Sequence, residues 1–335
     1  MKRTTLKDLA KLLNLSPSTI SRALADHPDI SENTKRRVQD VAKGMNYIPN
    51  LRAKYLRTRH SNVIALILPE MNMFFMPSLM NGINKVVENK DYSLIVLQSD
   101  NSLWKEKQLI QYCLNLSVDG ILLSVSKETK NLSHLSPLLD NEVPVVLLDR
   151  LIDNDSFSTV NIANQEAAFK ATNYLIEKGH QRIVGVFADT ELSISTERIL
   201  GFREAHAGSG IALRKNQILA IDNIEKFDTL FMRTLGKVKD VTAFFIMSDE
   251  LMVRTFRLLR QCGYTIPDDC SLIAISDGEA PGFLFPNITH LLHSGYDVGE
   301  KAAHILIGLI KDYSDTVIDA KVKTALIEGG SVQEI

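Results

Sequence analysis

Cysteine is scarce in this sequence, with only Cys113, Cys262 and Cys270 among 335 residues. None of the three stands in a CxxC pair, so they build neither a disulfide framework nor a zinc knuckle. We expect buried thiols in a reducing compartment. No stretch of about 18 uncharged apolar residues occurs, which argues against a membrane-spanning helix. No apolar core follows Lys2 and Arg3, so we expect no secretory signal.

Motifs of catalysis and cofactor binding are also missing. No GxGxxG follows the first predicted strand, and neither GxxxxGK[ST] nor GxSxG occurs. The glycine pair in Gly208-Ser209-Gly210 follows a predicted helix, which is the wrong context for a nucleotide. The eight histidines form no HExxH motif and show no metal-ligand spacing. We therefore expect no enzyme activity, no cofactor and no metal.

The first 60 residues are strongly basic, although the whole chain is close to neutral. They hold 13 Lys and Arg against 5 Asp and Glu, a charge of +8, which leaves −10 on the other 275 residues. The length favours two or three compact units. A basic head on an acidic body indicates a polyanionic partner for the head, and a merely solvated basic face is the alternative.

The head is predicted to contain three short helices. Thr5 and Asp8 have the spacing of a capping box at the start of the first helix. Ser16 is the expected N-cap of the second, with Pro17 at its first position. A three-residue turn between these two helices, in a basic segment, is the helix-turn-helix pattern.

The second helix carries a small polar face opposite its apolar residues. Ser18 and Ser21 supply hydroxyls that suit phosphate oxygens. Arg22 can read guanine through two parallel hydrogen bonds. Pro17 has no polar group and can offer only an apolar contact, such as one to a thymine methyl. This face fits the floor of a DNA groove better than a protein core.

A linker is expected at residues 46–61. Pro49 ends one element, and Asn50 can cap a short helix that runs to about Arg57. Within it, Leu56 has little local core to join. The residues alone leave open an ordinary hinge with Leu56 tucked onto the following body.

From Val63 onwards, apolar strand-like runs alternate with amphipathic helical patterns. Such runs favour parallel strands buried on both faces, and therefore a doubly wound α/β body. Four runs precede about residue 160 and four follow, which predicts two similar lobes. The strands are expected at 63–68, 92–98, 120–125, 143–149, 182–188, 217–221, 243–248 and 271–276, and helices at 104–116, 165–178, 197–207, 249–262 and 296–311.

Several polar residues fall at or just beyond predicted strand ends, where open α/β sheets bind ligands. Singly, each reads as a cap or a surface ion pair, but together they can line a cleft and hydrogen-bond a polar ligand. Phe74 and Phe75 are either an apolar wall of that cleft or ordinary core aromatics. The polar candidates are Asp149, Arg150, Arg198, Ser248, Asp249 and Asp277.

Longer motifs point to a known family. They are TTLKDLAKLLNLSPSTISRAL (4–24), ISENTKRRVQDVAKGMNYIPN (30–50), VDGILL (118–123), VPVVLLDR (143–150), IEKGHQRI (176–183), ERILGFREA (197–205), SDELM (248–252), GYTIPDDCSLIAISD (263–277) and LIEGGSV (326–332). In these stretches, which cover essentially the whole chain, the protein resembles the lac repressor (LacI/GalR) family of bacterial transcription regulators.

The resemblance implies a helix-turn-helix head at 1–46, a hinge at 47–61 and a two-lobed body at 62–335, similar to periplasmic sugar-binding proteins. Lobe 1 is expected at about 62–160 plus 292–322, and lobe 2 at about 161–291 plus 323–335. The implied protein is a cytoplasmic, nucleoid-associated bacterial regulator, most simply a repressor. It acts as a homodimer on near-palindromic double-stranded operator DNA, under the control of a small polar effector such as a sugar.

Site residues follow from the same resemblance, position by position. For DNA, the resemblance implies that Pro17, Ser18 and Arg22 read bases and that Ser16, Thr19 and Ser21 contact phosphates. Leu56, beside Ala53, takes the position of the hinge leucine that wedges into the minor groove. Further DNA-binding positions are Thr5, Tyr47 and Asn50. For the effector, Arg198 and Asp277 take the positions that hold hydroxyls, with Phe74, Phe75, Asp149 and Ser248 around them.

The sequence departs from the family in ways that bear on the effector. Leu192 and Ile194 stand where relatives often have polar residues, so we expect a more apolar pocket. No leucine-heptad tail is seen, which favours a dimer over a tetramer. The alternatives are a kinase-like α/β enzyme with a DNA-binding head, a plain ligand or transport receptor, and a regulator that senses no effector.

Overall fold

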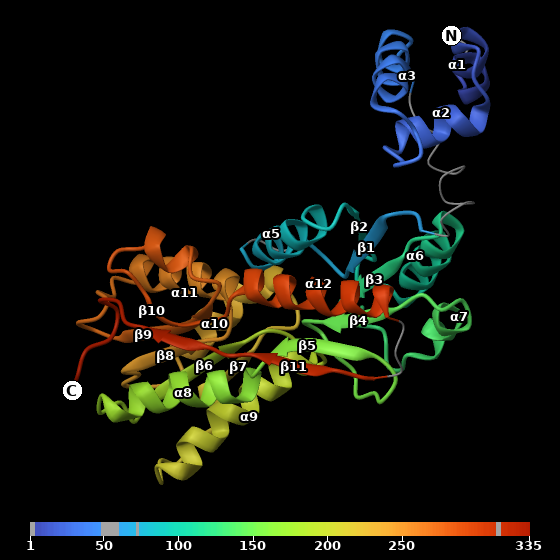
Figure 1. The fold of residues 1–335 in the computed structure, drawn as a ribbon. Coiled ribbons are helices and arrows are strands. Elements are labelled where there is room, and N and C mark those ends of the chain that lie inside the picture. Colours follow the sequence, from blue (N-terminus) through green and yellow to red (C-terminus); the bar gives the residue numbers. More distant parts are fainter. Residues whose placement is uncertain (1–3, 48–59, 72–73, 313–315) are drawn as a thin grey trace. The chain divides into compact units, whose positions relative to one another are not determined.

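The computed structural model describes residues 4–47, 60–71, 74–312 and 316–335. The chain divides into two compact units, Met1–Ser61 and Asn62–Ile335 (Figure 1). Asn50, Ala53 and Leu56, the hinge residues predicted to contact DNA, lie outside the described residues. No helix in the described ranges is long and apolar enough to cross a membrane.

The head consists of three helices, α1 (Leu6–Leu13), α2 (Pro17–Leu24) and α3 (Glu32–Gly44). The predicted capping box is present, because Asp8 accepts from the Thr5 backbone N–H at 2.8 Å and donates its own N–H to Thr5 Oγ1. Ser16 Oγ caps α2 by accepting from the Thr19 N–H at 3.0 Å. These local bonds fix where each helix begins.

A small apolar core joins the three head helices. Leu9 of α1, Ile20 and Ala23 of α2 and Val38 of α3 are fully buried in it. Asn14 closes α1 in a left-handed conformation, with a φ of 55°, which asparagine tolerates. The helix-turn-helix prediction is thereby confirmed.

The body contains two six-stranded sheets with similar strand orders, β11-β5-β4-β3-β1-β2 in lobe 1 and β12-β10-β9-β8-β6-β7 in lobe 2. The pairs are parallel except β10 with β12. The strands are β1 (Val63–Leu68), β2 (Ser93–Gln98), β3 (Gly120–Leu123), β4 (Val145–Leu148), β5 (Ser158–Ile162), β6 (Ile183–Phe187), β7 (Ile218–Ala220), β8 (Ala243–Ile246), β9 (Ser271–Ser276), β10 (Thr289–Leu292), β11 (Asp319–Val322) and β12 (Ala325–Ile327).

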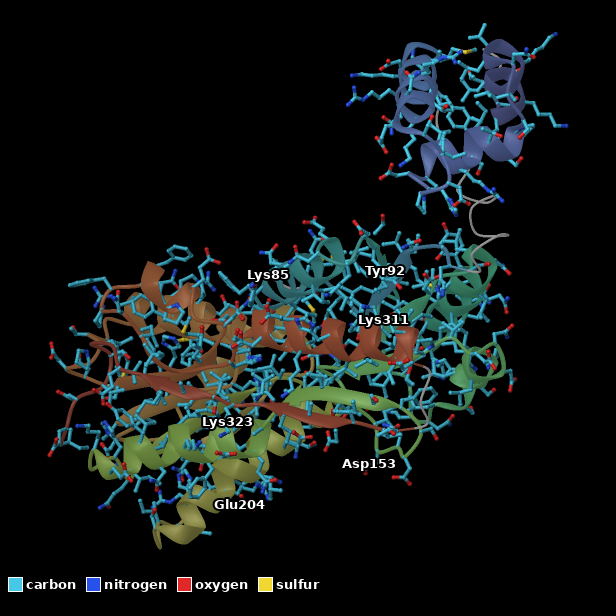
Figure 2. All side chains as sticks on the ribbon, viewed as in Figure 1. Lys85, Tyr92, Asp153, Glu204, Lys311 and Lys323 are labelled. Atoms are coloured by element: carbon cyan, nitrogen blue, oxygen red, sulfur yellow. The ribbon has the colours of Figure 1, made fainter. Side chains whose placement is uncertain are left out.

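Helices cover both sheets, which confirms the predicted doubly wound class. In lobe 1, α5 and α12 lie side by side (Figure 1), and a Cβ on Gly299 of α12 would stand 2.2 Å from Leu79 O of α5. Only glycine allows that approach. Figure 2 marks Lys85 of α5, which donates to Glu300 of α12 at 3.2 Å. The body helices are α5 (Phe75–Glu88), α6 (Leu103–Leu116), α7 (Ser136–Asp140), α8 (Asn164–Glu177), α9 (Ser193–Gly208), α10 (Phe227–Leu235), α11 (Asp249–Gln261) and α12 (Gly295–Lys311).

The chain passes between the two sheets after β5, after β10 and after β11. The first passage leads into α8, the second into α12, and the third into β12. Because these connections lie between two separately packed cores, they are the places where the lobes can change their relative angle.

Four strands were not predicted: β5, β10, β11 and β12. In β5 (STVNI) polar residues interrupt the apolar run, yet all five residues are buried. The hydroxyls are paired across the sheet, since Thr159 Oγ1 donates to Asp319 at 2.5 Å and Ser158 Oγ accepts from the Ile318 N–H. A strand that satisfies its polar groups only through tertiary partners leaves no periodic signal in the sequence.

Candidate DNA-binding and effector sites

The second helix of the head presents the face that the sequence singles out. Pro17, Ser18 and Arg22 are exposed, while Ile20 and Ala23 on the other side are buried. Exposed residues at the start of a helix-turn-helix recognition helix are those that reach base edges. These three side chains are therefore available to a groove.

The hydroxyls around the start of α2 form a small network. Ser16 Oγ lies 2.7 Å from Ser18 Oγ and 2.8 Å from Thr19 Oγ1. Thr5 Oγ1 donates to Asp8 at 2.7 Å in the capping box of α1. Several residues predicted to contact phosphates thus also hold the helix starts in place.

Two head residues, Tyr47 and Lys35, are not exposed like the face of α2. Tyr47 is half-buried and packs against the head core. Lys35 is buried and pairs with Asp26 at 2.7 Å and Glu32 at 2.8 Å. Lys35 therefore contributes to the basic count of the head but not to its accessible charge.

Between the lobes lies a cavity of about 370 Å³. Polar groups from the strand ends of both sheets meet there, together with apolar side chains that include the predicted Leu192 and Ile194. The lining residues are Glu70, Phe75, Met76, Asn101, Lys127, Asp149, Arg150, Ala188, Asp189, Leu192, Ile194, Arg198, Ile221, Asp222, Ile224, Met247, Ser248, Glu250, Leu251 and His293.

Arg198 is the most deeply buried cation of this cavity, with 3% of its surface exposed. Its Nε donates to Asn164 Oδ1 at 2.9 Å and its Nη1 to the Met247 carbonyl. Burial lowers the pKa of Arg198 to about 10, although Asp149 opposes the shift. Three of its five N–H groups remain for a ligand, because the two bonds use only two.

Asp149 faces the cavity from the end of β4. It adopts a left-handed φ of 60° and accepts from Ser124 Oγ at 3.3 Å. Burial raises the pKa of its carboxyl, and the neighbouring Arg150 and Arg198 oppose that shift. Ser248, directly before α11, lines the same cavity from the other lobe, and its hydroxyl makes no capping hydrogen bond to α11. The carboxylate and hydroxyl together offer acceptors and a donor to a hydroxylated ligand.

Phe75 forms an apolar wall with a residue that the sequence did not single out. Its ring stacks on His293 with centroids 4.5 Å apart and planes 1° apart. Burial lowers the pKa of His293 well below its usual value, so the ring is neutral at pH 7. Stacked flat rings of this kind suit the face of a sugar or a planar ligand.

A pair of charges bridges the lobes at the rim of the cavity. Lys127, after β3, donates to Asp189, after β6, and lies 3.4 Å from Glu191. Burial alone would raise the pKa of Asp189, but the bond to Lys127 lowers it overall. Both residues follow predicted strands, and this position was the only feature of the sequence that could have indicated the pair.

Asp277 and Phe74 are not among the residues that line the cavity. Asp277 accepts from the Gly295 N–H at 2.5 Å and from the Ser78 hydroxyl, and so joins the end of β9 to the starts of α12 and α5. Phe74, with a φ of 70°, packs against the core of lobe 2. Both residues connect the lobes next to the cavity, and their predicted contact with the effector stays a prediction.

Asp277 gives the body a measurable pH dependence. Burial raises the pKa of its carboxyl to about 6, and Asp249 and Glu279 add to the shift. A folded pKa above the unfolded one means that the native state holds the proton more tightly, so stability falls as pH rises from about 4 to 6. Asp277→Asn keeps an acceptor for Gly295 and cannot ionise. We expect it to gain stability relative to the wild type between pH 4.5 and 7 in urea unfolding.

The matched control is Asp268→Asn, which removes an exposed carboxylate of the same lobe that is not among the groups shifting the pKa of Asp277. Its curve of unfolding free energy against pH is expected to run parallel to that of the wild type. If the curve of Asp277→Asn also ran parallel to that of the wild type, the Asp277 carboxyl would have no raised pKa.

No group of three or more His, Cys, Asp or Glu in the described part of the chain is placed to hold a metal ion. What the geometry defines is a ligand-binding body of the periplasmic-binding-protein type that carries a helix-turn-helix unit. Comparison with known proteins supports this class. Residues 61–277 match the family model of periplasmic binding proteins and sugar binding domain of LacI family, and residues 5–50 match that of bacterial regulatory proteins, lacI family.

The chain therefore belongs to the LacI family of bacterial regulatory proteins, and the predicted resemblance is confirmed. It is a DNA-binding transcriptional regulator and not an enzyme. The curated regulator RegA of Clostridium saccharobutylicum is 28% identical over 92% of each chain. The structure of the lac repressor dimer bound to operator and the anti-inducer ONPF has a TM-score of 0.88 at 17% identity, over 99% of this chain and 100% of that one. The transcriptional regulator CelR–cellobiose complex has a TM-score of 0.72 at 23% identity, covering 98% and 100%.

Proposed function

We propose that this regulator is a cytoplasmic homodimer that represses transcription from near-palindromic operators, and that a neutral, hydroxylated effector in the cavity between its lobes controls the affinity for DNA. The observation that carries the proposal is Arg198, which has three free N–H donors in a cavity lined by both lobes. A ligand held by groups from both lobes favours one angle between them.

On DNA, the proposal assigns base contacts to Pro17, Ser18 and Arg22, whose exposure supports this role. Phosphate contacts go to the hydroxyls at the start of α2, and the minor-groove wedge to Leu56. An inserted leucine unstacks a base step and bends the duplex. The two-fold symmetry of a dimer matches a near-palindromic site.

The charge of the cavity supports a neutral effector. Five carboxylates line it, against three cations. Arg150 is already paired with Glu70 and with Asn101 at 2.6 Å, and Lys127 with Asp189. An anionic ligand would meet net negative charge. Leu192, Ile194 and the stacked Phe75 and His293 favour a ligand that also has an apolar face, such as a disaccharide or a glycoside. CelR, similar in fold, was solved with cellobiose.

A thermal-shift screen tests the effector assignment. We expect a neutral disaccharide or glycoside to raise the melting temperature of the full chain, because a ligand that binds only the folded state stabilises it. At 100 times Kd the gain is about 2.7 kcal/mol, which corresponds to roughly 5–10 °C for a body of this size. Sugar phosphates are not expected to bind in this cavity, so any melting shift they cause should persist in Arg198→Ala. A complete lack of response to neutral sugars and glycosides would favour a regulator that senses no small molecule there.

A gel shift on a pool of random duplexes tests the DNA part. We expect a selected near-palindromic sequence, and an affinity that falls steeply between 50 and 200 mM salt as lysines and arginines displace counterions. Recovery of no preferred sequence would contradict the operator assignment. Repeating the shift with the effector from the thermal screen shows whether that ligand lowers or raises the affinity.

A further inference from the structure

Lobe 2 has a second cavity, of about 600 Å³, that is separate from the one between the lobes. It lies at the outer edge of the sheet, where β7 pairs only with β6 among the described strands. The last turns of α9 form one wall, and the segment from residue 211 to 218 forms the other. No lining residue is shared between the two cavities.

The charge of this outer cavity is all of one sign. Arg203, Arg214 and Lys215 line it and are exposed, and no carboxylate is among its lining residues. None of the three cations pairs with a carboxylate in the described ranges of the chain. Glu204, which follows Arg203 in the sequence and is labelled in Figure 2, already has a partner. Both of its oxygens accept from Gln165 Nε2 of α8 at 2.8 Å. Three unpaired cations around one hollow attract an anion.

A buried histidine in the same wall has a nitrogen acceptor that lacks a hydrogen-bond donor. His206 is 1% exposed, and its Nδ1 lies 2.8 Å from the Phe202 carbonyl, so Nδ1 carries the hydrogen. Burial lowers the pKa of His206, which keeps the ring neutral at pH 7. Its Nε2 is then an acceptor, and it is buried with no partner. A buried acceptor without a donor is costly and rare in native structures.

The backbone around the cavity is held firmly. The Ile211 N–H donates to the His206 carbonyl at 3.1 Å, which closes the end of α9. Gln217 is buried, donates to the Ile183 carbonyl at 2.9 Å and accepts from the Arg214 N–H at 2.8 Å. These bonds fix the turn that presents Arg214 and Lys215.

We propose that the outer cavity of lobe 2 binds a small hydroxylated phosphate ester, with the phosphate on Arg203, Arg214 and Lys215 and a hydroxyl that donates to His206 Nε2. Because Nε2 is closed off from solvent in the ligand-free chain, the exposed side chains around it must shift when the ester binds. Ile211 and Ile218 in the lining give the carbon skeleton an apolar surface. The site differs from the proposed effector cavity in charge, in place and in the ligand it selects.

The main competing explanation is that basic residues at a helix C-terminus only complement the helix dipole. That explains Arg203, which lies in the last turns of α9, but it does not apply to His206, whose ring is neutral. It does not explain Arg214 and Lys215, which lie beyond the helix. It also leaves the unpartnered Nε2 of His206 without a reason.

The outer cavity shares a helix with the cavity between the lobes. Arg198 and His206 stand eight residues apart on α9, about 12 Å along its axis. A ligand that shifts the end of α9 can therefore also shift Arg198, and by linkage the effector then biases the outer site equally. The phosphate ester would act as a second regulatory signal.

Isothermal titration of the full-length protein at constant ionic strength tests the proposal, with glycerol 3-phosphate as the probe. Glycerol lacks the charge and sulfate lacks the hydroxyl, so both are expected to bind at least about tenfold more weakly. The double variant Arg214→Ala/Lys215→Ala changes only exposed side chains, and we expect it to weaken glycerol 3-phosphate at least about tenfold. His206→Phe keeps an aromatic ring against Phe202 and should reduce glycerol 3-phosphate to the affinity of sulfate.

Two controls separate this site from the effector cavity. Arg233→Ala removes an exposed arginine of α10 that does not line the outer cavity, and should leave glycerol 3-phosphate binding unchanged. Arg198→Ala should still bind glycerol 3-phosphate even though its effector site is lost. The proposal is overturned if the wild type does not bind the ester, or if Arg214→Ala/Lys215→Ala binds it as well as the wild type does. Either result leaves the effector proposal untouched.

Discussion

Replacing Arg198 with alanine is expected to abolish the response to effector while leaving operator binding intact. The guanidinium is almost fully buried, and its bonds to Asn164 and to the Met247 carbonyl fix it with three donors left for the ligand. A hydrogen bond to a charged group contributes about 1.5–3 kcal/mol, so the loss of two weakens effector binding at least about 100-fold. Calorimetry with the effector from the thermal screen measures this loss.

Arg233→Ala is the matched control for this prediction. It removes an exposed arginine of α10 that lines neither the cavity between the lobes nor the outer cavity of lobe 2. Its effector affinity should equal that of the wild type. Arg198→Ala also leaves two acceptors without a donor, which costs about 1–3 kcal/mol of stability, so its folding must be checked by thermal melting. If a folded Arg198→Ala protein still releases operator DNA on addition of effector, Arg198 is not part of the effector site.

Replacing Arg22 with alanine is expected to remove most sequence-specific DNA binding while sparing non-specific binding. Arg22 is exposed on the face of α2 opposite the head core. A bidentate contact to guanine contributes about 1–3 kcal/mol, and a dimer makes it twice. The affinity for the selected operator should therefore fall at least about 30-fold, whereas the affinity for random DNA changes little. Gel shifts on both duplexes give the ratio.

Arg36→Ala on α3 is the control for Arg22. It removes an exposed cation of the head that lies outside the recognition helix. Any loss of affinity should then be shared by operator and random DNA, because a phosphate contact carries no sequence information. An unchanged ratio for Arg22→Ala would assign this arginine to the phosphate backbone and move base reading elsewhere on α2.

The sequence alone was sufficient for the head because its signals are local. The bonds from Thr5 to Asp8 and from Ser16 to Thr19 span three residues each, so spacing along the chain predicts them. The same holds for the central strands of the body, whose apolar runs are buried on both faces wherever their neighbours lie. Family motifs then extended the prediction from fold to function.

The edge strands of the sheets and the set of residues that line the cavity could not be predicted from local signals. Strand β5 is polar in sequence, and its hydroxyls find partners near β11 about 160 residues away. Spacing along the chain carries no information about such partners. The strand-end rule directed attention to Asp149, Arg198 and Ser248, which line the cavity, and it gave equal weight to Asp277, which bonds to the start of α12 instead.

By itself, then, the sequence determined the head, the order of the central strands along the chain and the family. Tertiary structure decided which strand ends meet, that Lys127 pairs with Asp189 across the lobes, that His293 stacks on Phe75, and that Arg203, His206 and Arg214 gather around a second cavity. The physical reason is range. Caps and apolar periodicity act between neighbours on the chain, whereas a binding site is made by side chains that only the packing of two lobes brings together.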